Sequence, residues 1–149
     1  MARIKLVYVF LDVENIPSHP YAFRIRRFSR RFGKVHPDRL RAYAVNWRIR
    51  EEAQKMLQKA SFLTKNVAPG ENAVDNRIIR DCTTFSQQGR PQDVYILVSG
   101  DGDYVEMVEM LHDRDKYVVC LTSKAHAASK RLLQCVDEHY FLEDLYSSN

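Results

Sequence analysis

The chain has 149 residues, of which 45% are hydrophobic and 28% are charged, and this composition is typical of an ordinary globular domain rather than a disordered or fibrous chain. We therefore expect residues 1–149 to form a single domain with a hydrophobic core of its own. The formal net charge of +4 permits a polyanionic partner without requiring one.

The predicted elements alternate between short apolar runs and amphipathic stretches along the whole chain. The first strand covers residues 3–11 and is apolar throughout from Leu6, which places it in the middle of a sheet. A loop with Pro17 and Pro20 follows, and Gly33 is expected to end the next helix. Further strands are predicted at 39–46, 62–68, 94–98 and 116–122, and helices at about 20–32, 51–60, 73–88, 103–112 and 127–135, before a last short segment near 139–142. This β-α-β-α-β-α-β-α-β order predicts an α/β fold with a mostly parallel, five-stranded sheet and right-handed crossovers.

The central motif of the chain is the buried strand 94–98 together with the polar turn SGDGD that follows it. In an open α/β sheet, ligands bind just beyond the carboxyl ends of the central strands, so Asp101 and Asp103 mark the expected site. Two neighbouring carboxylates raise one another's pKa, and a bound metal ion is the simplest way to keep both ionised. The alternative is a polar turn in which Asp103 caps the next helix, and the turn alone favours neither interpretation.

Two further acids are expected at the same edge of the sheet. Asp12 ends the first strand, and Asp75 lies in the first turn of the helix at 73–88, where its charge can face the same crevice. Taken singly, Asp12 is explained as a turn residue and Asp75 as an acid favoured by the helix dipole. Taken together, the four acids make an oxygen-only site that suits Mg²⁺ or Mn²⁺, and phosphodiester hydrolysis is the chemistry that fits it.

A basic segment between Arg24 and Arg50 has one acid, Asp38, among its many arginines. Aromatic residues are interleaved with the arginines, as in grooves that track a nucleic-acid backbone and stack its bases. The alternative is that the aromatics form core and the arginines a solvated face, and for the aromatics we favour the core. The candidate phosphate contacts are Arg24, Arg27, Arg31 and Arg48, with Lys124 near the last helix, where a solvated face is an equal alternative.

The cysteines and the lack of a targeting signal predict a cytoplasmic protein. Cys82, Cys120 and Cys135 are odd in number, lie in apolar contexts and lack CxxC spacing, so buried reduced thiols are expected rather than disulfides or a zinc site. The apolar run that begins at Leu6 is too short to span a bilayer and has no cleavage site of small residues, so no membrane association is expected.

The segments FLDVENIP, AVDNRIIRD and ILVSGDGDYVEMVEML resemble, in this order, the motifs of the NYN family of PIN-like nucleases, and ASKRLLQCVDEHYFLEDL resembles that family's closing helix and strand. The resemblance covers nearly the whole chain. It implies a PIN-like, Rossmann-like three-layer α/β/α fold with a sheet of order 3-2-1-4-5, and RNA cleavage supported by Mg²⁺ or Mn²⁺. Carried over by position, the acidic metal-site residues are Asp12, Asp75, Asp101 and Asp103. The resemblance also implies that Asn15 holds the loop or positions water and phosphate, and that Ser99 supports the acids from behind.

Two positions need separate comment within this resemblance. Asp81 matches a recurrent acid of the family, but it lies roughly 240° around the helix from Asp75, so both cannot point at one ion. We expect Asp81 to support the residues that bind the metal rather than to bind the ion itself. The turn before the fifth predicted strand has Asp115 where the family commonly has Gly.

The function expected from the sequence is therefore a metal-dependent ribonuclease, most simply an endoribonuclease acting on single-stranded RNA, with selectivity that a protein partner or a homodimer would supply. One alternative is a non-catalytic RNA-binding or regulatory module on the same fold. Another is a haloacid-dehalogenase-like phosphatase, because G-D-G-D resembles the late acidic motif of that family. That family's first strand should end in D-x-D, whereas this chain has Asp12, Val13 and Glu14. A Toprim-like interpretation of D-G-D is also open, although it expects a Glu after the first strand.

Overall fold

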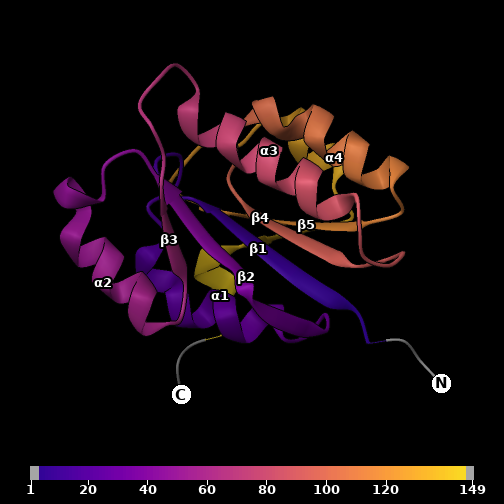
Figure 1. Ribbon diagram of the computed structural model, residues 1–149, viewed down its shortest axis with the longest axis horizontal. Helices are drawn as coiled ribbons and strands as arrows, with labels where there is room; N and C mark the ends of the chain where they lie inside the picture. The colour runs from indigo at the N-terminus through magenta and orange to yellow at the C-terminus, as the bar shows by residue number, and fades with distance from the viewer. Residues whose placement is uncertain (1–3, 147–149) are drawn as a thin grey trace.

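The computed structural model describes residues 4–146, which form a sheet with helices on both of its faces (Figure 1). The strands are β1 (Leu6–Asp12), β2 (Lys34–Ala44), β3 (Leu63–Asn66), β4 (Val94–Val98), β5 (Tyr117–Thr122) and β6 (Glu138–Phe141). The helices are α1 (Ala22–Ser29), α2 (Glu51–Lys59), α3 (Ala73–Ser86), α4 (Val105–Asp113) and α5 (Lys130–Cys135). Short 3-10 turns are η1 (His19–Tyr21), η2 (Trp47–Arg50), η3 (Gly102–Tyr104) and η4 (Leu142–Asp144).

The sheet has six strands in the order β3-β2-β1-β4-β5-β6, and every neighbouring pair is parallel. The predicted order 3-2-1-4-5 is confirmed for the first five strands, but the predicted total of five strands is wrong. The sixth strand pairs with β5 from Val119 opposite Glu138 to Thr122 opposite Phe141. It is a four-residue edge strand whose residues are all only partly buried, so it lacks the apolar run that identifies a strand covered on both faces.

Two cores lie on opposite faces of the sheet, which gives the three-layer α/β/α arrangement. Along β1, Val7, Val9 and Leu11 pack into the core under α1 and α2, whereas Tyr8 and Phe10 pack into the core under α3, α4 and α5. Figure 1 shows α3 and α4 on one side of the strands and α1 and α2 on the other. The alternation follows from the two-residue period of a strand and explains why β1 is apolar at every position. None of the helices described in 4–146 is long and apolar enough to cross a bilayer.

The entry into β2 differs from the sequence prediction. The helix expected to reach Gly33 ends at Ser29, and β2 begins at Lys34 rather than at Arg39. Gly33 has φ +153°, and a Cβ there would lie 2.2 Å from the carbonyl oxygen of Lys5. The glycine therefore serves a close approach of two backbones, and the Lys34 N–H donates to that same carbonyl at 2.8 Å.

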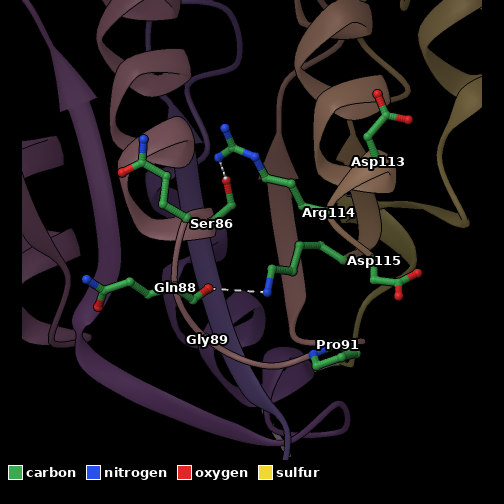
Figure 2. A pocket seen from close by; sticks show the side chains of 9 residues that line it. Ser86, Gln88, Gly89, Pro91, Asp113, Arg114 and Asp115 are labelled. Carbon is green, nitrogen blue, oxygen red and sulfur yellow. Dashed lines mark hydrogen bonds between the residues drawn. The ribbon is translucent and has the colours of Figure 1, made fainter.

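At the amino ends of β4 and β5, a pocket of about 590 Å³ lies between the ends of α3 and α4 (Figure 2). The two basic side chains that line it, Arg114 and Lys116, both donate hydrogen bonds to other groups of the chain. Arg114 Nη1 donates to Ser86 Oγ at 2.6 Å, and Lys116 Nζ donates to the carbonyl oxygens of Gln88 and Arg90 at 3.3 and 2.9 Å. These contacts fasten the end of α3 and the loop that follows it, which is the ordinary role of cations at a helix C-terminus.

Candidate active site

The carboxyl ends of β1 and β4 bring the first acids together. The two strands pair in parallel with Leu11 opposite Val98, so Asp12 and the turn that starts at Ser99 leave the sheet side by side. Helix α3 begins at the same edge and has Asp75 in its first turn. The three segments that were expected to supply acids therefore converge at one edge of the sheet.

Three carboxylates form the centre of the cluster. One oxygen from each of Asp75, Asp101 and Asp103 lies within 4.8 Å of the other two. Asp75 is buried, Asp101 is half-buried and Asp103 is exposed, so the cluster extends from the protein interior to solvent. A cation or a phosphate can thus reach the acids from outside without a change in the fold.

Asp12 is the fourth acid and is buried like Asp75, with only 4% of its surface exposed. Its Oδ2 accepts a hydrogen bond from the Tyr104 hydroxyl at 2.9 Å, and its Oδ1 accepts one from the Asn15 N–H at 3.1 Å. Burial raises the pKa of Asp12 to about 6, and the charges of Asp75 and Asp101 add to the rise, although both hydrogen bonds oppose it. Asp12 is not one of the three mutually close carboxylates, but the charges of Asp75 and Asp101 contribute to its raised pKa.

Asp75 has a raised pKa for similar reasons. Burial is the largest cause, followed by a hydrogen bond with the Asp103 carboxyl and by the charge of Asp101. The pKa values of two of the four acids are thus raised, mainly by burial and further by the charges of neighbouring carboxylates.

The acidic turn is held by hydrogen bonds to its own backbone. Asn15 Oδ1 accepts from the Gly100 N–H at 2.9 Å, and Ser99 Oγ accepts from the Asp101 N–H at 3.2 Å. Asp101 Oδ1 accepts from the Asp103 N–H at 2.9 Å, so Asp101 caps the turn rather than the Asp103 that the sequence suggested as a cap. Asn15 and Ser99 therefore contact the turn that carries two of the acids.

Sequence reasoning missed the contacts that two residues make at this site. Tyr104 lies within the helix predicted at 103–112, and its hydroxyl donates to Asp12. A buried tyrosine needs a partner for its hydroxyl, and this was the available signal. The contact of Ser129 was not predicted because it is made by the backbone: its N–H donates to the Gly100 carbonyl at 2.8 Å. A Cβ on Gly102 would lie 3.0 Å from Ser129 Oγ, so the glycine lets these segments pack closely.

Asp81 lies away from the three-carboxylate group. Its carboxylate accepts from the Tyr43 hydroxyl at 2.7 Å, from Arg41 Nη1 at 3.2 Å and from Arg77 Nε at 3.3 Å. The expected angle between Asp75 and Asp81 is consistent with this separation. Two arginines compensate the charge of Asp81, so the position of this acid is accounted for without a metal ion.

The candidate phosphate contacts occupy different surroundings. Arg24 and Arg27 are on α1 and Arg31 follows its end, and each guanidinium lies over an aromatic ring of the same chain: Arg24 over Tyr21 at 5.7 Å, Arg27 over Tyr146 at 5.0 Å and Arg31 over Phe28 at 5.1 Å. Lys124 Nζ donates to Asp144 at 2.8 Å. Arg48 is exposed and lines a pocket that it shares with residues of the segment after β1.

The aromatic residues of the basic segment belong mainly to the core, as favoured from the sequence. Phe28, Tyr43 and Trp47 are buried, and Tyr21 and Phe32 pack partly buried against the core. Phe23 is the exception, since it is exposed.

Comparisons with known proteins agree with this fold. The family model described as the NYN domain matches residues 6–143. Among solved structures, the chain is similar to the crystal structure of a protein of unknown function from Vibrio parahaemolyticus, with a TM-score of 0.78 and 21% identity over 97% of this chain and 98% of that chain. This likeness shows the fold alone, and no curated protein matches the chain. Because the family model spans nearly the whole sequence and includes all four acids, the chain belongs to the NYN domain family.

Proposed function

We propose that this chain is a metal-dependent endoribonuclease that hydrolyses phosphodiester bonds in single-stranded RNA with the help of Mg²⁺ or Mn²⁺. The observation that carries the proposal is the convergence of three carboxylates within 4.8 Å at the carboxyl edge of a parallel sheet, beside a fourth that is buried. Ligand sites of α/β sheets lie at this edge. The NYN family adds a nuclease-like fold and RNA as the polymer.

The donor set fits a hard divalent cation. Asp75, Asp101 and Asp103 offer only carboxylate oxygens, which Mg²⁺ and Mn²⁺ prefer. Oxygens bound to one Mg²⁺ lie about 2.1 Å from it and hence at most about 4.2 Å apart. The separation of up to 4.8 Å comes into that range with small side-chain rotations. The raised pKa of Asp12 and that of Asp75 support the fit, because a cation would offset the charge crowding that contributes to both.

The residues of the chain have separate tasks in this reaction. The bound ion would activate a water and stabilise the charge that develops on the phosphate and its leaving oxygen. Asp75, Asp101 and Asp103 hold the ion, and Asp12 completes the acidic cluster in an orientation fixed by its two hydrogen bonds. Asn15 holds the acidic turn through Gly100, so it keeps the ligands in place.

The RNA backbone is expected to contact basic side chains outside the acidic cluster. Arg24, Arg27, Arg31, Arg48 and Lys124 remain the candidates, and a guanidinium that stacks on a ring keeps N–H groups for phosphate. Such contacts give binding that weakens with salt and carries little sequence information. Base selection must therefore come from other residues, from a protein partner or from a second copy of the chain.

The cytoplasm is the compartment that we infer for this enzyme. The cysteines Cys82, Cys120 and Cys135 are free thiols, and burial raises the pKa of each of them. Thiols in this state suit a reducing compartment.

The experiment is cleavage of end-labelled single-stranded RNA by purified protein with Mn²⁺, Mg²⁺ or EDTA. Asp101→Asn keeps a capping side chain but weakens the cluster, so cleavage should fall by at least about 100-fold. Asp113→Asn is the matched control, because Asp113 is exposed at the opposite edge of the sheet (Figure 2). We expect internal cuts that require metal, disappear in Asp101→Asn and persist in Asp113→Asn.

Three other outcomes would reject the proposal. Salt-sensitive RNA binding without cleavage under any metal would identify a non-catalytic RNA-binding module. Turnover of small phosphoesters without RNA cleavage would identify a phosphatase. Cleavage that is equal in both variants would identify a contaminating nuclease.

A further inference from the structure

A pocket of about 490 Å³ lies between the loop that follows β1 and the segment that follows β2. The first segment contributes Val13, Pro17 and His19, and the second contributes residues 48–53. Because β1 and β2 are parallel, with Asp12 opposite Tyr43, both segments leave the sheet at the edge where the acids lie. The pocket is therefore on the same edge as the acidic cluster.

A single short loop separates the pocket from the acids. Asn15, in the middle of this loop, binds Gly100 in the acidic turn. Pro17 and His19, a few residues further on, line the pocket. A nucleic-acid strand bound at the acids can thus reach the pocket by crossing only this loop.

Polar groups without partners are gathered around the pocket. Ser18 Oγ, His19 Nδ1 and Arg50 Nε are buried and have no hydrogen-bond partner among residues 4–146. Ser18 is completely buried, and Arg50 is held near Glu14, whose Oε2 lies 4.0 Å from its Nη2. Buried polar atoms almost always have a partner, so three such atoms beside one pocket indicate that a polar ligand binds here once the side chains that cover these atoms move.

The pocket also has an apolar side. Ile49 is 74% exposed at its rim, and the exposed Pro17 adds further apolar surface. A large aliphatic side chain that faces solvent at the mouth of a pocket suits a flat apolar ligand surface. The volume falls within the range of pockets that bind small organic groups.

The charges in the lining disfavour a phosphate as the occupant. Arg48 and Arg50 are matched by Glu51 and Glu52, so the lining has two cations and two acids. Burial and the charge of Arg50 lower the pKa of His19, so its ring is neutral at neutral pH. A neutral, flat group with hydrogen-bonding edges fits this lining better than an anion does.

We propose that this pocket binds one nucleobase of the RNA strand and so gives the enzyme a base preference of its own. The base stacks on Ile49 and Pro17, and rotation of the Arg50 and His19 side chains brings Arg50 Nε and His19 Nδ1 into hydrogen-bond contact with it. Proteins read single-stranded RNA in this way, with stacking on one side of a splayed base and polar contacts along its edges. The inference rests on the proposed function, because it takes RNA to be the polymer bound at the acids.

The test measures which bases are enriched when the protein selects RNA from a randomised single-stranded pool. All proteins carry Asp101→Asn in the presence of Mg²⁺, so that binding is read without cleavage. In this background we compare Arg50→Lys, which keeps the charge but loses the planar donor, and Ile49→Ala, which removes the stacking surface. Met56→Ala is the matched control, since it also shortens an exposed apolar side chain, 38% exposed on α2, outside the pocket.

The parent protein is expected to enrich one base at one position of the bound RNA. Arg50→Lys and Ile49→Ala should each reduce that enrichment about tenfold, whereas Met56→Ala should leave it unchanged. Thermal melting shows whether each variant folds, and Ile49→Ala decides the matter should Arg50→Lys fail to fold.

Uniform base usage in the parent protein, or an enrichment that both pocket variants retain, overturns the inference. The cleavage experiment and this one fail independently. Base-selective binding by a protein that never cleaves RNA would reject only the nuclease function. Metal-dependent cleavage with no base preference would reject only the pocket.

Discussion

The Asp12→Asn substitution tests the electrostatics of the acidic cluster in the metal-free protein. Burial, aided by neighbouring carboxylates, raises the pKa of Asp12 from 3.8 to about 6. A rise of about two units corresponds to about 3 kcal/mol, at about 1.4 kcal/mol for each unit. Because the folded state binds this proton more tightly than the unfolded state, the associated stability is fully present below about pH 4 and is lost as the pH rises through 6. Asn has nearly the same shape and cannot ionise, so the variant does not lose this contribution.

The measurement is the free energy of unfolding by urea, in EDTA, at pH values from 4 to 8. The stability of Asp12→Asn relative to the unaltered protein should increase by about 2 to 3 kcal/mol across this range, equivalent to a rise in Tm of about 4 to 12 °C. The exposed control Asp113→Asn should show no such trend. A difference between Asp12→Asn and the unaltered protein that stays constant with pH would refute the assignment of a raised pKa to Asp12. Adding Mg²⁺ or Mn²⁺ at pH 8 should then stabilise the unaltered protein more than the variant, because an ion that binds only the folded state stabilises it.

Three further predictions concern the surroundings of the cluster. Asp81→Asn removes the partner of two partly buried guanidiniums, so the free energy of unfolding should fall by about 3 kcal/mol in urea denaturation, with metal affinity unchanged by calorimetry. Gly100→Ala places a Cβ 3.0 Å from the Cβ of Ala128 and should displace the acidic turn, lowering metal affinity at least about tenfold, whereas Gly70→Ala meets no atom within 4 Å and should leave it unchanged. Lys116→Met removes the donor to two carbonyls at the far edge of the sheet and should lower Tm by about 2 to 8 °C without altering RNA cleavage.

The inner strands were predictable because each is covered on both faces. In a chain of this composition, an apolar run of five to seven residues, as in β1 and β4, indicates a strand in the middle of a parallel sheet. The edge strand β6 gave no such pattern, since each of its residues is only partly covered. The early start of β2 was hidden for a related reason: its first residues are largely exposed, and the close approach at Gly33 depends on Lys5, which is distant in sequence.

The acids of the site were predictable from topology, whereas their supports were not. Residues that end neighbouring parallel strands must share an edge, so the meeting of Asp12 with Asp101 follows from strand order alone. The hydrogen bond from the Tyr104 hydroxyl to Asp12 depends on the directions of the two side chains, which the hydrophobic pattern of the sequence does not reveal. Asp115 is an intermediate case. The resemblance seen in the sequence predicts Gly at this position, and the structure gives Asp115 φ +63°, a conformation that Asp tolerates better than most residues.

The loop after β1 connects the chemistry to base selection. Asp12, the last residue of β1, belongs to the acidic cluster, and Asn15 in the loop holds the acidic turn through Gly100. Pro17 and His19 in the same loop line the proposed base pocket. A base that binds in the pocket therefore contacts the same loop that holds the acidic turn. The bound base also fixes the position of the neighbouring phosphate relative to the acids. Since small errors in position cost large factors in rate, the preferred base should increase the rate of cleavage by more than it increases affinity.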